Sequence, residues 1–160
     1  MRNVRRARNT AALRSAVACS AAFVILPALA DAELDGARAR WQTAALSGYE
    51  YGYHKYCECH RESPPETIVS VRDGKVVRVR HRPAGSEVEV PAADKNFDYY
   101  WTVDGLFRLI ASALERGVEV RAMYDGALGY PREVYIDYDA DFIGDELDLR
   151  LTAVTPLPER

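Results

Sequence analysis

The stretch ELDLRLTAV at residues 146–154 decides the fold class of this chain. Its leucines alternate with polar residues, in the order Leu147, Asp148, Leu149, Arg150, Leu151 and Thr152. Successive side chains of a β-strand point to opposite faces of a sheet, so this strand has one apolar and one polar face. Such alternation is typical of an antiparallel sheet with one face on a core and the other in water.

An amphipathic helix is predicted upstream, in TVDGLFRLIASALERG at residues 102–117. Its apolar residues follow the i, i+3, i+4, i+7 spacing of one helix face: Val103, Leu106, Phe107, Ile110 and Leu114. Thr102 is a suitable N-cap, and Asp104 lies in the positively polarised first turn. Gly117 is typical of a C-terminal stop.

A second helix is predicted over residues 34–46, ended by Ser47-Gly48. Its apolar stripe consists of Leu34, Ala37, Trp41, Ala44 and Ala45. The strand that follows, at residues 49–54, should carry tyrosines on one face. Further strands are predicted at 118–124 and 132–138, and residues 82–96 indicate a surface connection.

A β-hairpin is predicted around Arg72-Asp73-Gly74, with strands at residues 67–71 and 75–79. A two-residue turn at Asp73-Gly74 would place Val69 opposite Arg78 and mix the two faces. A three-residue loop with Gly74 in the left-handed position places Val69 opposite Val77, and Thr67 opposite Val79. We predict the second register because it keeps one apolar face.

The predicted order is therefore α-βββ-α-βββ. The economical arrangement is an α+β two-layer sandwich, a mainly antiparallel sheet of about six strands with both helices on one face. The other face of the sheet should carry charges of both signs. It is interpreted either as a solvated face or as a docking surface. It would present His54, Arg78, Arg80, Arg121, Glu133, Tyr135 and Arg150.

The first thirty residues are typical of a secretory signal peptide. Five arginines precede an apolar run at 16–29, and Ala28-Leu29-Ala30 forms a small-x-small cleavage pattern. The run is shorter than the roughly twenty residues of a membrane span, so no span is expected after cleavage. We predict cleavage after Ala30, with Ala32 nearly as suitable, and a single exported domain at 31–160.

Removal of this leader leaves 16 Lys and Arg against 24 Asp and Glu, a net charge near −8. Nucleic acids and anionic membrane surfaces both favour clustered positive charge, so neither is expected as a partner.

Two cysteines remain after cleavage, Cys57 and Cys59. In an oxidising compartment they could form a disulfide, but residues i and i+2 of a strand lie about 6.6 Å apart, so the chain would have to kink at Glu58. A metal site is a second interpretation, because His54 and His60 flank the pair, and thiolates with imidazoles suit zinc or copper. A redox-active or intermolecularly paired thiol is the third.

An acidic segment contains Asp137, Asp139 and Asp141, followed by Gly144, Asp145, Glu146 and Asp148. Alternating aspartates in a loop can supply oxygen ligands for calcium. The match to an EF-hand loop is partial, since Phe142 stands at the sixth position and Asp148 at the twelfth. The alternative is a hydrophilic hairpin loop.

The chain resembles a family of exported bacterial proteins defined only as a domain of unknown function. The matching features are Trp41, Tyr49-x-Tyr51, Cys57-x-Cys59, Val71-x-Asp73-Gly74-x-Val76, Thr102-Val103-Asp104-x-Leu106-Phe107-x-x-Ile110, Tyr124-Asp125, Gly129-Tyr130-Pro131 and Ile136-Asp137. The resemblance implies an envelope or secreted setting, a shared fold and a cysteine pair that belongs to the scaffold. It implies no activity.

No Gly-x-Ser-x-Gly elbow, phosphate loop or His-Glu-x-x-His pattern occurs in the sequence. We therefore expect a non-enzymatic exported domain that binds a protein or envelope component, without a predicted cofactor. The alternative is a metal-handling or thiol-redox protein that uses Cys57 and Cys59. A hydrolase with a site assembled from scattered residues is a weaker third hypothesis.

Overall fold

The computed structural model describes residues 25–56, 66–83, 85–86, 90–91 and 100–158. The predictions for Cys57, Cys59 and His60 lie outside these residues, as do the leader up to residue 24 and most of the 82–96 connection.

The chain folds as an α+β protein with two helices and eight strands in the described part. In chain order these are α1 (Ile25–Ala44), β1 (Gly48–Tyr56), β2 (Glu66–Arg72), β3 (Lys75–Arg82), β4 (Val90–Pro91), α2 (Val103–Glu115), β5 (Glu119–Tyr124), β6 (Pro131–Asp137), β7 (Leu147–Leu151) and β8 (Thr155–Pro156). The six predicted strands are present, but β4 and β8 are additional. Each has two residues, one of them proline, and so is too short to show a periodic pattern.

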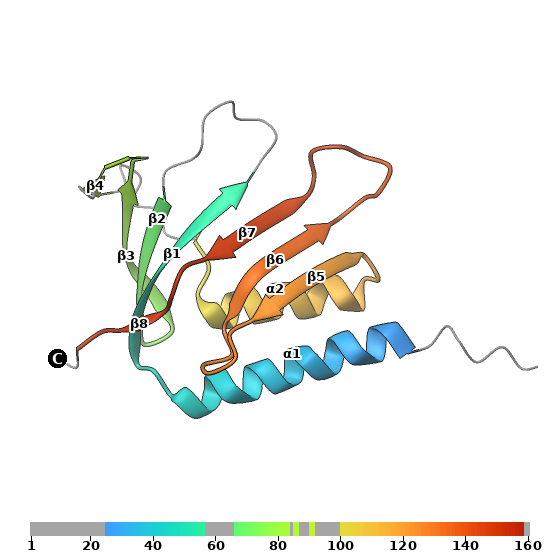
Figure 1. The fold of residues 1–160 in the computed structure, drawn as a ribbon, viewed down its shortest axis with the longest axis horizontal. Helices are drawn as coiled ribbons and strands as arrows, with labels where there is room; N and C mark the ends of the chain where they lie inside the picture. The colour runs from blue at the N-terminus through green and yellow to red at the C-terminus, as the bar shows by residue number, and fades with distance from the viewer. Residues whose placement is uncertain (1–24, 57–65, 84, 87–89, 92–99, 159–160) are drawn as a thin grey trace, which may run out of the picture.

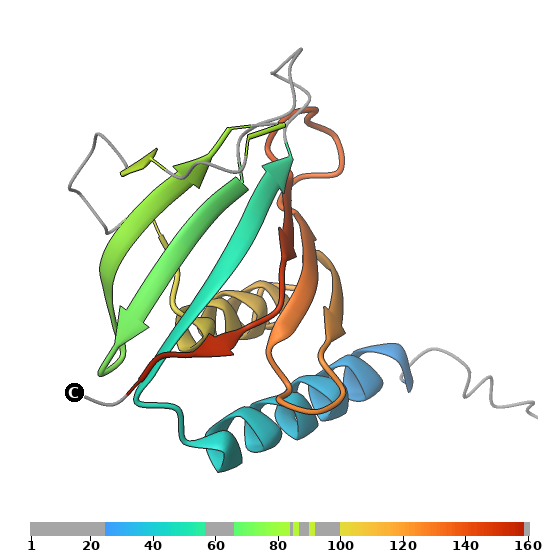
Figure 2. The same cartoon turned by 60° about the vertical axis from the view of Figure 1, so that its left-hand side comes forward.

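The strands form one antiparallel sheet in the order β4-β3-β2-β1-β7-β6-β5, and β8 also pairs with β1 (Figure 1). Strand β1 lies at the centre. It pairs with β2 along residues 48–53 and with β7 along residues 53–56. The C-terminal segment therefore completes the sheet beside the strand that follows the first helix (Figure 2).

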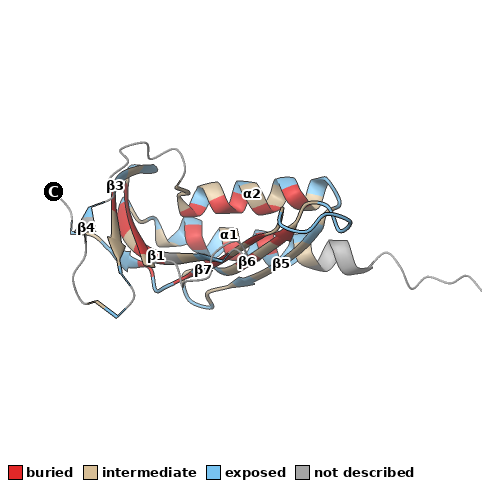
Figure 3. Cartoon of the chain, turned by 90° about the horizontal axis from the view of Figure 1, so that it is seen from above, coloured by how far each residue is buried: buried red, intermediate tan, exposed pale blue. Residues whose placement is uncertain are grey.

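Both helices lie on the same side of the sheet (Figure 3). Helix α2 forms as predicted: Thr102 is its N-cap, and the chain after it passes through Gly117 in the left-handed region. Its buried face meets alternate residues of β2, β6 and β7 in one core. The largest fully buried side chains are Phe107, Leu106, Ile110, Ile136, Leu149, Val69, Val71, Val103 and Val134. Burial of these apolar side chains is the main contribution to the stability of such a two-layer domain.

Helix α1 differs from the prediction at both ends. It begins at Ile25 rather than Leu34, and it ends at Ala44, because Ala45 adopts a φ of 46°. Gly48, predicted to stop the helix, is the first residue of β1. Leu34, Ala37 and Trp41 are buried as expected, whereas Ala45 is exposed.

Two tyrosines of β1 connect the sheet to the start of α2. The Tyr49 hydroxyl accepts a hydrogen bond from the Val103 amide at 2.9 Å, and the Tyr51 hydroxyl donates to the Trp101 carbonyl. The Trp41 ring of α1 packs edge-on against Tyr49, with centroids 5.0 Å apart. Burial raises the pKa of Tyr49 despite the opposing effect of the Val103 hydrogen bond, so this hydroxyl stays neutral.

The β2–β3 hairpin has a different register from the predicted one. The turn has two residues, Asp73 and Gly74, with φ values of 48° and 70°, and Arg72 pairs with Lys75. A β-bulge then leaves Val77 without a partner on β2, so that Val69 faces Val79 rather than Val77. The apolar face of the hairpin is preserved, as the prediction required. An extra residue inserted in β3 preserves it, rather than the predicted three-residue loop.

The loop between β5 and β6 packs tightly against α1. Asp125 Oδ1 accepts hydrogen bonds from the amides of Ala127 and Leu128, and Gly129 follows with a φ of 83°. A Cβ atom at Gly129 would lie against the Ala37 carbonyl oxygen, well inside van der Waals contact. This position therefore needs glycine both for its backbone conformation and for the close approach of α1.

We expect Gly129→Ala to destabilise the protein by about 2–4 kcal/mol, because it combines an unfavourable φ with a backbone clash. Gly126→Ala in the same loop is the matched control. Its Cβ would have no atom within 4 Å, so we expect a change within about 0.5 kcal/mol. Urea unfolding measures both free energies, and equal effects would contradict the proposed contact.

Replacement of Tyr49 by Phe should lower the free energy of unfolding by about 1–3 kcal/mol, because the buried Val103 amide loses its acceptor. Tyr56→Phe is the control, since Tyr56 is 41% exposed at the far end of the same strand. A loss of the same size in both variants would show that the Val103 hydrogen bond does not account for the effect.

Candidate binding face on the outer side of the sheet

The face of β1, β7, β6 and β5 turned away from the helices carries two rows of side chains that cross the strands. One row runs through His54, Arg150, Glu133 and Met123, and the other through Tyr56, Asp148, Tyr135 and Arg121. We call these eight residues the outer face. Five of them were predicted on this side of the sheet: His54, Arg121, Glu133, Tyr135 and Arg150.

Arginine–tyrosine stacks dominate the outer face. The Arg121 guanidinium lies 4.2 Å from the centroid of Tyr135, and that of Arg150 lies 5.2 Å from the centroid of Tyr56. Arg121 also forms an ion pair with Glu119 at 3.2 Å. The Met123 side chain beside them is 59% exposed. These side chains are held by neighbours within the sheet, yet they remain open to solvent.

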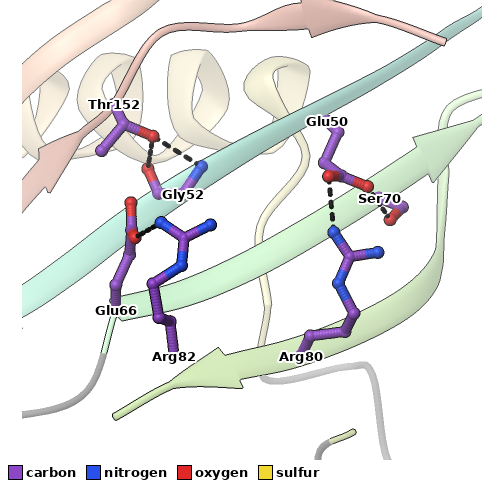
Figure 4. A network of polar contacts seen from close by, with 7 residues as sticks. All are labelled: Glu50, Gly52, Glu66, Ser70, Arg80, Arg82 and Thr152. Atoms are coloured by element: carbon purple, nitrogen blue, oxygen red, sulfur yellow. Dashed lines mark hydrogen bonds and ion pairs between the residues drawn. The ribbon is translucent and has the colours of Figure 1, made fainter. Parts of the chain in front are cut away.

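The neighbouring half of the sheet carries a more buried group of polar residues, which we call the polar cluster (Figure 4). Glu50 accepts hydrogen bonds from the Ser70 hydroxyl at 2.7 Å and from Arg80 at 2.6 Å. Glu66 accepts from Arg82 at 2.5 Å. The Thr152 hydroxyl donates to the Gly52 carbonyl and accepts from the Gly52 amide. Each carboxylate thus has a cation beside it, which is what a half-buried charge requires.

The polar cluster explains why Gly52 interrupts β1. A Cβ atom there would collide with the side chains of Glu66 and Thr152. Only Arg80 of this group was predicted on the outer side. The polar residues of β1 and β2 alternate with apolar ones, and this alternation predicts the side of the sheet on which they lie. It does not predict which strand supplies the partner of each carboxylate.

The acidic segment forms the loop between β6 and β7. Asp139 Oδ1 accepts a hydrogen bond from the Asp141 amide at 3.1 Å. Burial, Asp137, Glu146 and Asp139 raise the pKa of Asp145. Asp137, Asp139 and Asp141, the predicted calcium ligands, do not come together as a ligand set. In the described ranges no three His, Cys, Asp or Glu side chains do so.

The predicted metal site at the cysteines is represented in the described residues only by His54. This histidine is half-buried on the outer face, and its ring centroid lies 6.2 Å from that of Tyr56. The motif residues Trp41, Gly129, Tyr130 and Pro131 support the scaffold, because they lie in the core or where the β5–β6 loop meets α1. Gly74 forms the β2–β3 turn.

Comparison with known proteins identifies one family. The model of the Family of unknown function (DUF6174) matches residues 33–156, which include every strand of the sheet. No curated protein and no solved structure matches the chain. None of the helices in the described residues is both long and apolar enough for a membrane span. The predicted resemblance to a domain family of unknown function is confirmed, and the chain belongs to the family DUF6174.

Proposed function

We propose that the protein is an exported, non-enzymatic domain that binds a protein or another envelope component through the outer face. The observation that carries this proposal is the pair of arginine–tyrosine stacks beside an exposed methionine. Tyrosine, arginine and methionine are enriched in protein interfaces, and tyrosine and arginine often contribute most of the binding energy.

The stacks also reduce the entropy lost on binding. Arg121 rests on Tyr135 and is paired with Glu119, so its long side chain is already restrained in the free protein. A preorganised side chain loses less freedom when a partner covers it. The polar cluster, by contrast, has its carboxylates engaged by arginines and a serine of the same sheet, which favours a structural role for it.

Export is supported by the position of the domain within the chain. The family match begins at residue 33, and Leu34 is the first buried residue among those whose burial the structure describes. Cleavage after Ala30 would cut within α1 but would leave the buried residues Leu34, Ala37 and Trp41 in place. The buried residues in the described part of α1 thus lie after the predicted cleavage site.

A photo-crosslinking amino acid in place of Met123 should yield one discrete adduct in the cells that make the protein. Met123 lies on the outer face and is 59% exposed. The same amino acid at Glu115, exposed on α2, is the control and should give none. Mass spectrometry of the adduct checks the result.

Arg121→Ala should abolish this adduct, because it removes one stack without disturbing the core. Arg116→Ala is the matched control: Arg116 stacks on Tyr138 at 5.2 Å, but it follows α2 rather than lying on the outer face. The proposal fails if no adduct forms at position 123, if the Glu115 position gives the same adduct, or if Arg121→Ala leaves it unchanged.

The alternative function, metal handling or thiol redox chemistry, rests on Cys57 and Cys59 with His54 or His60. Protein purified from its own compartment should then contain stoichiometric zinc or copper, measured by elemental analysis. A disulfide predicts instead that alkylation adds no mass until a reductant is present. Two thiols that alkylate freely without reductant would exclude the disulfide, and absence of metal in that sample would exclude the metal site.

A further inference from the structure

Two large apolar side chains stand exposed at the tip of the loop between β6 and β7. Phe142 is 64% exposed and Ile143 is 85% exposed, and they are consecutive in the chain. The loop lies at the same end of the sheet as the end of β1, where Tyr56 is also exposed (Figures 1 and 2). A contiguous apolar patch exposed to solvent is one of the features that mark protein contact sites.

Local hydrogen bonds hold this apolar tip outward. The Phe142 amide donates to the Asp139 carbonyl at 2.9 Å, which closes the turn before the tip. After the tip, Gly144 adopts a φ of 101°, and its amide donates to Glu146 at 2.9 Å. The two side chains are therefore presented by a structured loop, so a partner need not order them.

The charged residues of the segment that carries the tip all have one sign. Residues 137–149 contain no Lys, Arg or His, and their acidic residues are Asp137, Asp139, Asp141, Asp145, Glu146 and Asp148. Burial, and after it the neighbouring carboxylates of Asp137, Glu146 and Asp139, raise the pKa of Asp145. An occupant that covers the tip must be compatible with this negative field.

We propose that the Phe142–Ile143 tip docks into a cationic polypeptide surface, with the two side chains in an apolar pocket and the surrounding carboxylates facing lysines or arginines. The proposal rests on the proposed binding function and specifies the chemistry of the partner next to the outer face. Complementary charge favours encounter with such a surface and disfavours anionic lipids. A symmetric contact between the tips of two copies would bring two acidic segments together.

The test uses the full exported protein and a defined probe, an amphipathic lysine–leucine peptide, with a glutamate–leucine peptide as its counterpart. We expect the lysine peptide to bind and the glutamate peptide not to bind. Ile143→Asp should weaken binding of the lysine peptide by about tenfold or more, as measured by calorimetry.

This substitution separates apolar docking from simple charge attraction. It adds a negative charge, so binding driven by charge alone would become tighter, whereas loss of an apolar contact makes it weaker. Val77→Asp is the matched control, because Val77 is an exposed apolar residue on a different hairpin, 45% exposed. It should not weaken binding.

The double variant Asp139→Asn, Asp141→Asn should also weaken binding, and the loss should shrink as salt is raised. Glu115→Gln with Asp35→Asn, which removes two carboxylates from the helices, should have no such effect. Circular dichroism confirms that the variants are folded.

Several results would overturn the proposal: tighter binding by Ile143→Asp, equal binding of both peptides, binding of phosphatidylglycerol vesicles instead of the peptide, or self-association that Ile143→Asp abolishes. The crosslink from position 123 is measured separately. If that adduct persists in Ile143→Asp and the lysine peptide does not bind the protein, only the proposal for the tip fails. The proposal that the outer face binds a partner then stands.

Discussion

The contact between the tyrosines of β1 and the start of α2 is the constraint on which the rest of the structure depends. Tyr49 and Tyr51 are spaced two residues apart, so both point to the inner face, and their hydroxyls engage the backbone at Val103 and Trp101. This contact fixes the start of α2 beside the central strand. The core of α2, β6 and β7 then closes around Phe107 and Ile110.

In this arrangement the two faces of the sheet have different roles. The inner face supplies the core, which leaves the opposite side of the sheet free to vary in chemistry. Across β2 and β3 it carries the polar cluster, where carboxylates and arginines satisfy one another. Across β7, β6 and β5 it carries the arginine–tyrosine stacks, which remain accessible and form the surface we propose for binding.

Much of the fold could be predicted because it depends on residues near one another in the chain. The spacing of Leu106, Phe107 and Ile110 and the Thr102 cap identify α2, and the leucines at 147, 149 and 151 identify β7. The outer face was predictable in part for the same reason. The predicted register of the β2–β3 hairpin was wrong because the bulge at Val77 has no local signature in the sequence. The bulge places Val69 opposite Val79.

By itself, the sequence determined the element types, the α+β class and the sides of most strands, since strand and helix periods are local properties of the chain. Only the tertiary structure decided which distant segments meet. It placed β7 beside β1, joined Glu50 to Arg80 and Ser70, brought Gly129 against Ala37, and left Phe142 and Ile143 uncovered. The physical reason is that such pairings follow from the packing of the whole core, and no local pattern encodes which strand becomes the neighbour of another.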